Sequence, residues 1–227
     1  VSCFNGNDGV ASVVVTGGTL PFTYSWNNGD TDSLNTGLIA GTYILTVTDA
    51  LGCSLVDSVT ITEPPVLSST MATTNVGCFG GVTGSATVTV IGGTLNYSYL
   101  WSNGQAADNI NALVAGIYIV TVTDGKGCTL LDTAIITQPS AGLSLTLTQT
   151  NVSCFGGNDG EFIVIPNGGT TPYTYLWSNA DADSIAQNLI AGNYSVTVTD
   201  NNGCPAIGNG TVTHPTQLIS NINTSVN

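Results

Sequence analysis

One phrase occurs three times along the chain: Gly41-Thr-Tyr-Ile-Leu-Thr-Val-Thr-Asp-Ala-Leu-Gly-Cys53, Gly116-Ile-Tyr-Ile-Val-Thr-Val-Thr-Asp-Gly-Lys-Gly-Cys128 and Gly192-Asn-Tyr-Ser-Val-Thr-Val-Thr-Asp-Asn-Asn-Gly-Cys204. In each copy apolar side chains alternate with Thr or Ser, which is the period-two pattern of a strand with one buried face. The Asp-x-x-Gly that follows is typical of a tight turn. The phrase therefore predicts a β-strand, a turn and a cysteine at the start of the next strand.

The phrase is part of a longer internal repeat. Trp26, Trp101 and Trp177 are 75 and 76 residues apart, and the tyrosine and aspartate of the phrase keep the same spacing. The sequence repeats are Val1–Asn75, Val76–Asn151 and Val152–Asn227. Self-similarity at a fixed period indicates a tandem array of one small structural unit.

Other strands surround the phrase in each repeat. An earlier alternating segment is expected to point its apolar side chains inward, and these are Ala11, Val13, Val15, Ala86, Val88, Val90, Phe162 and Val164. A Gly-Gly turn and an aromatic strand that ends in tryptophan come next. Short strands at regular spacing, with no helical pattern, predict an all-β fold of three tandem immunoglobulin-like β-sandwich repeats in a linear array. The tryptophan is expected in the core, and Tyr43, Tyr118 and Tyr194 are expected to form tyrosine-corner contacts.

Domain boundaries are expected after the prolines, out of phase with the sequence repeats. The predicted domains are 1–65, which lacks its first strand, then 66–139 and 140–215. Residues 216–227 are the first strand of a following repeat or a donor strand to the next chain. The residues assigned to this inter-repeat strand are Thr216, Leu218, Ile219, Ile222 and Asn227.

Two interpretations of this phase remain open. In the first, three repeats have been cut from a longer continuous array. In the second, residues 216–227 complete the first domain of the next molecule by strand addition. Both make the partners neighbouring repeats or identical chains arranged head to tail in a filament.

The charge balance excludes several classes of function. The chain has one Lys or Arg against fourteen Asp or Glu, for a formal net charge of −13. Binding to a phosphate backbone or to an anionic membrane depends on Lys and Arg, so no nucleic acid is expected as a partner. No apolar run approaches the roughly 18 residues of a membrane-spanning helix, so no direct membrane insertion is expected.

The six cysteines fall into three pairs with the same internal spacing of fifty residues: Cys3 and Cys53, Cys78 and Cys128, Cys154 and Cys204. The chain has no CxxC motif and a single histidine, which disfavours a zinc site. We therefore expect one disulfide in each repeat, clamping one end of the sandwich, and hence an oxidising compartment. Closing a fifty-residue loop contributes about 4 kcal/mol in the chain-entropy model.

These residues resemble the SprB-type repeat of bacterial gliding-motility adhesins and other large cell-surface repeat proteins. The resemblance rests on Asn151-Val-Ser-Cys-Phe-Gly-Gly-Asn-Asp-Gly160, Pro172-Tyr-Thr-Tyr-Leu-Trp-Ser-Asn179 and Ala191–Cys204, and it recurs in all three repeats. It implies secretion to the outside of a bacterial cell. The expected function is structural or adhesive, as a stalk or multivalent adhesin that could touch surface glycans or other cells. The alternative is a carbohydrate-binding or spacer module array of a secreted enzyme.

The resemblance also implies O-glycosylation, because gliding bacteria of this type modify Asp-Ser or Asp-Thr followed by an apolar residue. The chain has four such tripeptides, at Ser33, Ser58, Thr133 and Ser184. They occupy two places in the repeat, since 33 corresponds to 184 and 58 to 133. Sugars at these places would protect the sheet surfaces from proteolysis and edge pairing.

No enzyme, cofactor or metal site is expected. His214 is the single histidine and stands beside Pro215 at a domain junction, where a linker role is the simpler interpretation. Calcium would need six to eight oxygens. The candidate carboxylates are Asp8, Asp30, Asp32, Asp159, Asp181 and Asp183, but the second repeat lacks both patterns. Turn formation by Asn-Asp-Gly and Asp-x-Asp is therefore the preferred interpretation.

Overall fold

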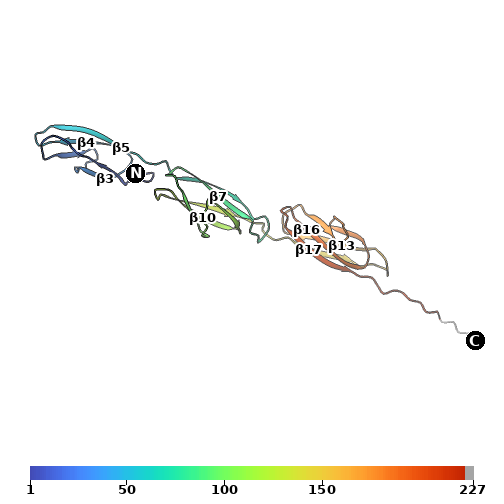
Figure 1. The fold of residues 1–227 in the computed structure, drawn as a ribbon. Helices are drawn as coiled ribbons and strands as arrows, with labels where there is room; N and C mark the ends of the chain where they lie inside the picture. Colours follow the sequence, from blue (N-terminus) through green and yellow to red (C-terminus); the bar gives the residue numbers. More distant parts are fainter. Residues whose placement is uncertain (223–227) are drawn as a thin grey trace, which may run out of the picture. The chain divides into compact units, whose positions relative to one another are not determined.

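The computed structural model describes residues 1–222, which form seventeen β-strands and no helix within that range (Figure 1). Of the residues assigned to an inter-repeat strand, Thr216, Leu218, Ile219 and Ile222 form no strand in this chain, and Asn227 lies outside the described residues. The strands are β1 (Gly9–Ser12), β2 (Thr23–Trp26), β3 (Leu34–Leu38), β4 (Gly41–Thr48), β5 (Ser54–Ile61), β6 (Ser68–Thr74), β7 (Gly84–Ile91), β8 (Ser98–Trp101), β9 (Asn109–Leu113), β10 (Gly116–Thr123), β11 (Thr129–Ile136), β12 (Ser144–Thr150), β13 (Gly160–Asn167), β14 (Thr174–Trp177), β15 (Ile185–Leu189), β16 (Gly192–Thr199) and β17 (Pro205–Val212).

The described chain divides into two compact units. The first contains Val1–Thr73, Ala86–Ile110 and Ile117–Ile135. The second contains Thr74–Ser85, Asn111–Gly116 and the chain from Ile136 onward. Each unit holds one terminal sandwich and a part of the middle repeat, and each is described by itself below.

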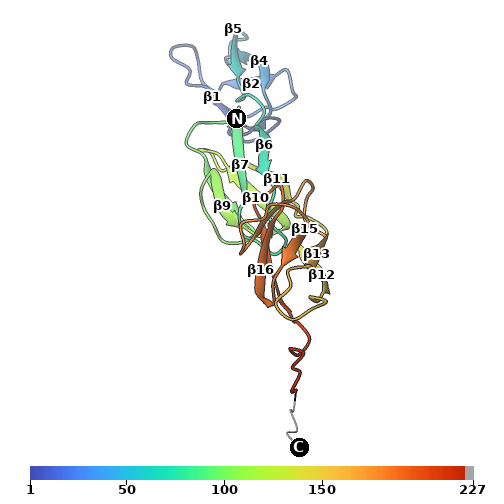
Figure 2. The same cartoon turned by 90° about the vertical axis from the view of Figure 1, so that its right-hand side faces the viewer.

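The third sandwich, in the second unit, shows the complete repeat. Its sheets have the strand orders β12-β13-β15 and β14-β16-β17, and all pairings are antiparallel. Figure 2 labels β12, β13, β15 and β16 of this sandwich. In immunoglobulin nomenclature these are the A-B-E and C-F-G sheets, without strand D. One core joins the two sheets, and it contains Phe162, Trp177 and Val196. Leu143, Leu145 and Leu147, from β12 and the residue before it, pack against the same core.

The first sandwich, in the first unit, has one strand fewer. Its sheets are the two-stranded β1-β3 and the three-stranded β2-β4-β5. Its core contains Ala11, Trp26, Leu38 and Leu45. The middle repeat again has two three-stranded sheets, β6-β7-β9 and β11-β10-β8. The all-β, immunoglobulin-like prediction is confirmed, because each repeat builds two sheets in the same strand order, apart from the one strand that the first sandwich lacks.

Most of the predicted core residues are buried. Of the eight side chains expected to point inward, Val13, Val15 and Val90 are half-buried and the other five are buried. Trp26, Trp101 and Trp177 are only 5%, 2% and 2% exposed, and each indole N–H donates to a backbone carbonyl six residues further along the chain. A buried indole N–H needs such an acceptor. The tyrosine corner is also present in the first and third sandwiches, since the hydroxyls of Tyr43 and Tyr194 donate to the carbonyls of Ile39 and Ile190, both at 3.1 Å.

Candidate functional site

The disulfides are the main departure from the sequence prediction. The structure joins Cys3 to Cys128 and Cys78 to Cys204, with Cα atoms 5.7 Å apart in both bonds. The predicted pairing of cysteines within a repeat is therefore wrong. Each bond joins the opening loop of one sandwich to a strand–turn–strand of the next, while Cys53 and Cys154 are exposed and unbonded in this chain.

The geometry of one sandwich explains why the predicted pairing fails. The opening loop lies beside the far end of β5, where the Val1 ammonium donates to the Thr62 carbonyl at 2.6 Å and the Asn5 N–H donates to the Glu63 carboxylate at 2.7 Å. Cys53 directly precedes the other end of β5. Eight residues of strand separate the two ends by about 25 Å. A disulfide needs Cα atoms within about 7 Å, so Cys3 cannot reach Cys53.

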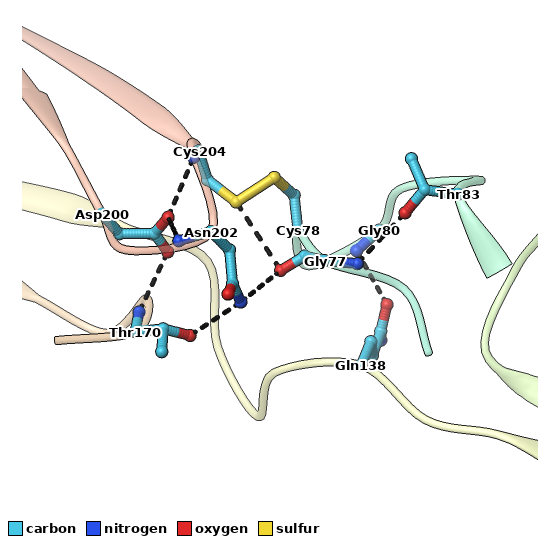
Figure 3. Close-up of a disulfide and its surroundings, with 9 residues drawn as sticks. All are labelled: Gly77, Cys78, Gly80, Thr83, Gln138, Thr170, Asp200, Asn202 and Cys204. Atoms are coloured by element: carbon cyan, nitrogen blue, oxygen red, sulfur yellow. Dashed lines mark hydrogen bonds between the residues drawn. A yellow bond between two sulfur atoms is a disulfide. The ribbon is translucent and has the colours of Figure 1, made fainter. Parts of the chain in front are cut away.

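We call each of these disulfides, with the opening loop and the turn that it joins, a clamp. In each clamp an aspartate fixes the cysteine of the turn by hydrogen bonds, as Figure 3 shows for Cys204. In the third sandwich Asp200 Oδ1 accepts the N–H groups of Asn202 at 2.9 Å and Cys204 at 2.8 Å, and its Oδ2 accepts the N–H of Thr170 at 2.9 Å. Asp49 and Asp124 make the same three contacts in their own repeats. The aspartate of the Asp-x-x-Gly-Cys phrase therefore fixes the backbone of the cysteine by hydrogen bonds. It does so in the first repeat as well, where Cys53 is unbonded.

The opening loop on the other side of the clamp is also fixed by hydrogen bonds. The Gly81 N–H donates to the Cys78 carbonyl at 2.9 Å, and the Gly80 N–H donates to the side chain of Gln138 at 2.8 Å. Across the junction the Asn202 amide donates to the Gly77 carbonyl at 2.9 Å (Figure 3). Both cysteines are thus presented from ordered backbone, and a polar contact supports the covalent bond.

Hydrogen bonding sets the charge state of the turn aspartates. Burial of Asp200 raises its pKa, but the N–H groups of Cys204, Thr170 and Asn202 outweigh this effect and hold the pKa below its ordinary value. The N–H of Thr94, assisted by Cys128 and Lys126 and opposed by burial, lowers the pKa of Asp124 in the same sense. Each turn therefore needs its carboxylate ionised.

We expect Asp200→Asn to destabilise the protein by about 1–3 kcal/mol, because the amide nitrogen of Asn cannot accept the half-buried Thr170 N–H. A carboxylate with a lowered pKa contributes stability above its ordinary pKa and loses it as the pH falls through the lowered value. The deficit of the variant should therefore be constant from pH 5 to 8 and shrink below about pH 4. Urea unfolding at several pH values measures this. Asp183→Asn, at an exposed aspartate, is the control, and an equal loss in the two variants would contradict the role of Asp200.

Three of the six calcium candidates accept backbone N–H groups within their own loops. Asp8 and Asp159 accept the N–H groups of Ser2 and Ser153 at 2.8 and 2.9 Å, and Asp30 accepts the N–H of Asp32 at 2.8 Å. Hydrogen bonds from Ser2 lower the pKa of Asp8, and those from Ser153 lower the pKa of Asp159. Within residues 1–222 no group of three or more His, Cys, Asp or Glu side chains is arranged to hold a metal ion.

The four candidate glycosylation positions differ in exposure. Ser33, Ser58 and Thr133 are exposed, and Ser184 is half-buried. The N–H groups of Ser58 and Thr133 both donate to the preceding aspartate at 2.7 Å, so these two sites share one local geometry. His214 packs edge to face on Phe155 with ring centroids 4.7 Å apart. The sequence predicts that His214 belongs to a linker, and this contact joins that linker to the loop of Cys154.

Spacing could not have revealed the true disulfide partners. The bonded cysteines are 125 and 126 residues apart, which is one repeat period plus the fifty residues of the expected pairing. A periodic sequence makes both pairings equally regular. The linear sequence shows which residues are cysteines, but the positions of the two ends of each sandwich decide which of them meet.

Comparison with known proteins gives one family. The SprB repeat model matches residues 1–31, 70–106 and 146–182, one match in each repeat. No curated protein matches the chain in sequence. Within residues 1–222 there is no helix that is long and apolar enough to span a membrane.

Several solved structures are similar to the chain. They include the N-terminal eight Ig domains of Down syndrome cell adhesion molecule (12% identity, 92% of this chain and 34% of that chain, TM-score 0.38). They also include extracellular domains 3–5 of Drosophila OTK (12% identity, 93% of each chain, TM-score 0.34) and domains 4–9 of surface layer protein SbsC (16% identity, 89% of this chain and 40% of that chain, TM-score 0.22). The chain thus spans about a third of the first of these structures.

The strand order, the repeated clamp and the cysteine chemistry define a tandem immunoglobulin-like repeat protein stapled by disulfides. The SprB repeat model matches a part of each of its three repeats. The disulfides, the tandem repeats and the SprB repeat matches together indicate an extracellular, repeat-type surface protein.

Proposed function

We propose that the chain is a load-bearing segment of a filament on the outside of a bacterial cell, gliding-adhesin-like, acting as a stalk or a multivalent adhesin. The observation that carries the proposal is the pairing of Cys3 with Cys128 and of Cys78 with Cys204. At each junction two successive sandwiches are joined twice, once by the backbone linker and once by the disulfide. A chain that only had to present independent binding modules would not need the second connection.

The two disulfides also create a covalent shortcut. A force that enters at Cys3 passes through the bond to Cys128, along the backbone to Cys78, and through the second bond to Cys204. Most of the first and third sandwiches lie outside this path. They can therefore unfold locally without lengthening the tether, which is a useful property for a stalk under tension.

The alternative, a carbohydrate-binding array, has weaker support. Sugar-binding modules commonly use exposed aromatic rings as platforms, but the three tryptophans are buried in the cores. We also assign no catalysis to the chain, since the ring of its single histidine is engaged with Phe155. Avidity from many copies remains compatible with a stalk, because weak contacts multiply along a repeated surface.

Labelling of intact cells tests the proposal. Antibodies against the folded repeats should label unpermeabilised cells along filaments, and protease treatment should remove the label. Mass spectrometry of the released protein should find extra mass on peptides that contain Ser33, Ser58, Thr133 or Ser184, with the cysteines disulfide-bonded. Label that requires permeabilised cells, together with reduced cysteines at positions 3, 78, 128 and 204, would overturn the surface proposal.

A further inference from the structure

One sheet of the middle repeat exposes an apolar outer face. Side chains alternate between core and solvent along its strands β8, β10 and β11. The large apolar side chains that point outward are Leu100, Ile117, Ile119, Leu131 and Ile135, which are 59%, 67%, 45%, 67% and 59% exposed. We call these five residues, with the Ser and Thr side chains between them, the middle face; all five lie in the first compact unit. An exposed apolar patch that spans three strands is typical of an interaction site.

The fold does not require these apolar side chains. Ile117 and Ile135 stand where the other two sandwiches have a polar cross-strand pair. In the third sandwich the partners are Asn193 and Thr211, and the Thr211 hydroxyl donates to the Asn193 side-chain oxygen at 2.7 Å. In the first sandwich the pair consists of two threonines whose hydroxyl oxygens are 3.3 Å apart. Packing within the sandwich therefore does not account for two exposed isoleucines at this place.

A further position of the middle face differs from the third sandwich in the same sense. Ile119 stands where the third sandwich has Ser195, and Ser195 lines a shallow hollow whose other side chains are mainly Ser, Asn and Thr. Leu100 and Leu131 have apolar counterparts in the third sandwich. In the middle repeat isoleucine thus replaces the polar half of the face, and the apolar surface extends over all three strands.

The charge of the chain favours a second copy as the partner of this face. The chain has fourteen acidic residues and one basic residue, so two copies repel each other wherever their carboxylates meet. The outward side chains of β8, β10 and β11 include no ionisable group. Asp132 of β11 points to the other side, where it accepts the hydroxyl of Ser69 at 2.6 Å. Two copies can therefore meet at their middle faces without bringing carboxylates together, whereas a basic partner would find no acid there.

The size of the middle face fits a weak dimer. Three strands at about 4.8 Å spacing, with eight residues at about 3.3 Å each, form a surface of about 14 by 26 Å. Two such faces pack about 10 Å apart with their side chains interdigitated. They remove on the order of 1,000 Å² of surface from water, which is at the lower end of specific protein interfaces. A concentration-dependent dimer is therefore expected.

We propose that the middle face binds the middle face of a second copy of this chain. Because both copies use the same surface, the contact has two-fold symmetry and closes as a dimer. The contact joins chains side by side. It therefore goes beyond the proposed load-bearing function, which concerns force along one chain.

Sedimentation equilibrium of the whole chain tests the proposal. Cys53→Ser/Cys154→Ser serves as the background, so that exposed thiols cannot crosslink the chains. The expected result is a monomer–dimer equilibrium with a dissociation constant of about 10–100 μM. A chain that stays monomeric at about 1 mM would overturn the proposal.

Two substitutions in this background locate the interface. Ile117→Asn introduces the residue of the third sandwich and should weaken the dimer at least tenfold, because each copy loses an apolar contact. Ile91→Asn is the matched control: Ile91 is 63% exposed on β7 of the other sheet, and the third sandwich has Asn167 there. It should change the dissociation constant less than twofold. Tryptophan fluorescence checks that both variants are folded, and equal weakening by the two would contradict the assignment of the face.

The dependence on salt separates an apolar contact from an ionic one. Raising the salt concentration from about 50 to about 500 mM screens the repulsion between two acidic chains and leaves apolar contacts in place. The dimer should therefore become several times tighter. A dimer that weakens with salt would have to be held by charged groups, and the proposal would be wrong.

A sugar is the other possible occupant of the middle face, because Thr133 points outward between Leu131 and Ile135. A glycan on Thr133 would keep the two faces apart, so the proposal predicts that Thr133 is unmodified in protein taken from cells. Mass spectrometry that finds a sugar on Thr133 would assign the face to the glycan and overturn the pairing. None of these results touches the two disulfides or the labelling of cells. The load-bearing proposal and the pairing proposal can therefore fail separately.

Discussion

Pulled from its two ends, the oxidised chain is expected to reach only about a third of the extension of the reduced chain. With both disulfides formed, the shortest covalent path runs from Val1 to Cys3, from Cys128 back to Cys78, and from Cys204 to the C-terminus. This path contains about 75 residues, so its fully unfolded length is about 260 Å at roughly 3.5 Å per residue. Reduction restores a path of about 226 residues, or about 790 Å.

Single-molecule force spectroscopy of the purified monomer measures this difference directly. A Cys3→Ser/Cys128→Ser variant keeps one bond, and its path of about 100 residues should extend to about 350 Å. Cys53→Ser/Cys154→Ser should match the unmodified protein, because neither of these cysteines is bonded in the chain. If disulfides formed within each repeat, each would shorten its own repeat by about fifty residues. Cys53→Ser/Cys154→Ser would then lengthen the path, which is the outcome that contradicts the structure.

The second large effect concerns stability. Cys78→Ser/Cys204→Ser should lower the free energy of unfolding by about 5 kcal/mol, because the bond closes a loop of 126 residues and restricts the unfolded chain. Urea unfolding of monomeric protein, followed by tryptophan fluorescence, measures the loss. Both cysteines are replaced together so that no free Cys204 is left to exchange with Cys154.

Cys154→Ser is the matched control for this stability experiment, since Cys154 stands in an opening loop equivalent to that of Cys78. Because Cys154 is exposed and unbonded, its replacement should change the free energy of unfolding by less than about 0.5 kcal/mol. A loss as large as that of the Cys78→Ser/Cys204→Ser variant would mean that Cys154 pairs with Cys204, as the sequence alone suggested.

Much of each sandwich follows from local patterns in the sequence. Val-Thr-Val-Thr specifies a strand with one buried face, and Val120, Val122, Val196 and Val198 are all fully buried. Asp-x-x-Gly specifies a turn, and its aspartate does accept the N–H groups of that turn. The tyrosine corner is equally local, because Tyr194 bonds a carbonyl only four residues away. Interactions across a few residues are encoded by those residues, so the sequence determined them.

The disulfide partners were decided by the tertiary structure. In a periodic sequence Cys78 is as regularly spaced from Cys128 as from Cys204, and no local pattern distinguishes the two. The choice depends on strand direction: eight residues of β5, β11 or β17 separate the opening loop from the turn of its own sandwich. The loop therefore lies at the end from which the chain continues to the next sandwich. The sequence by itself determined three sandwiches, each with two cysteines. The length of one strand keeps those two cysteines apart, and it therefore decided that the disulfides join successive sandwiches.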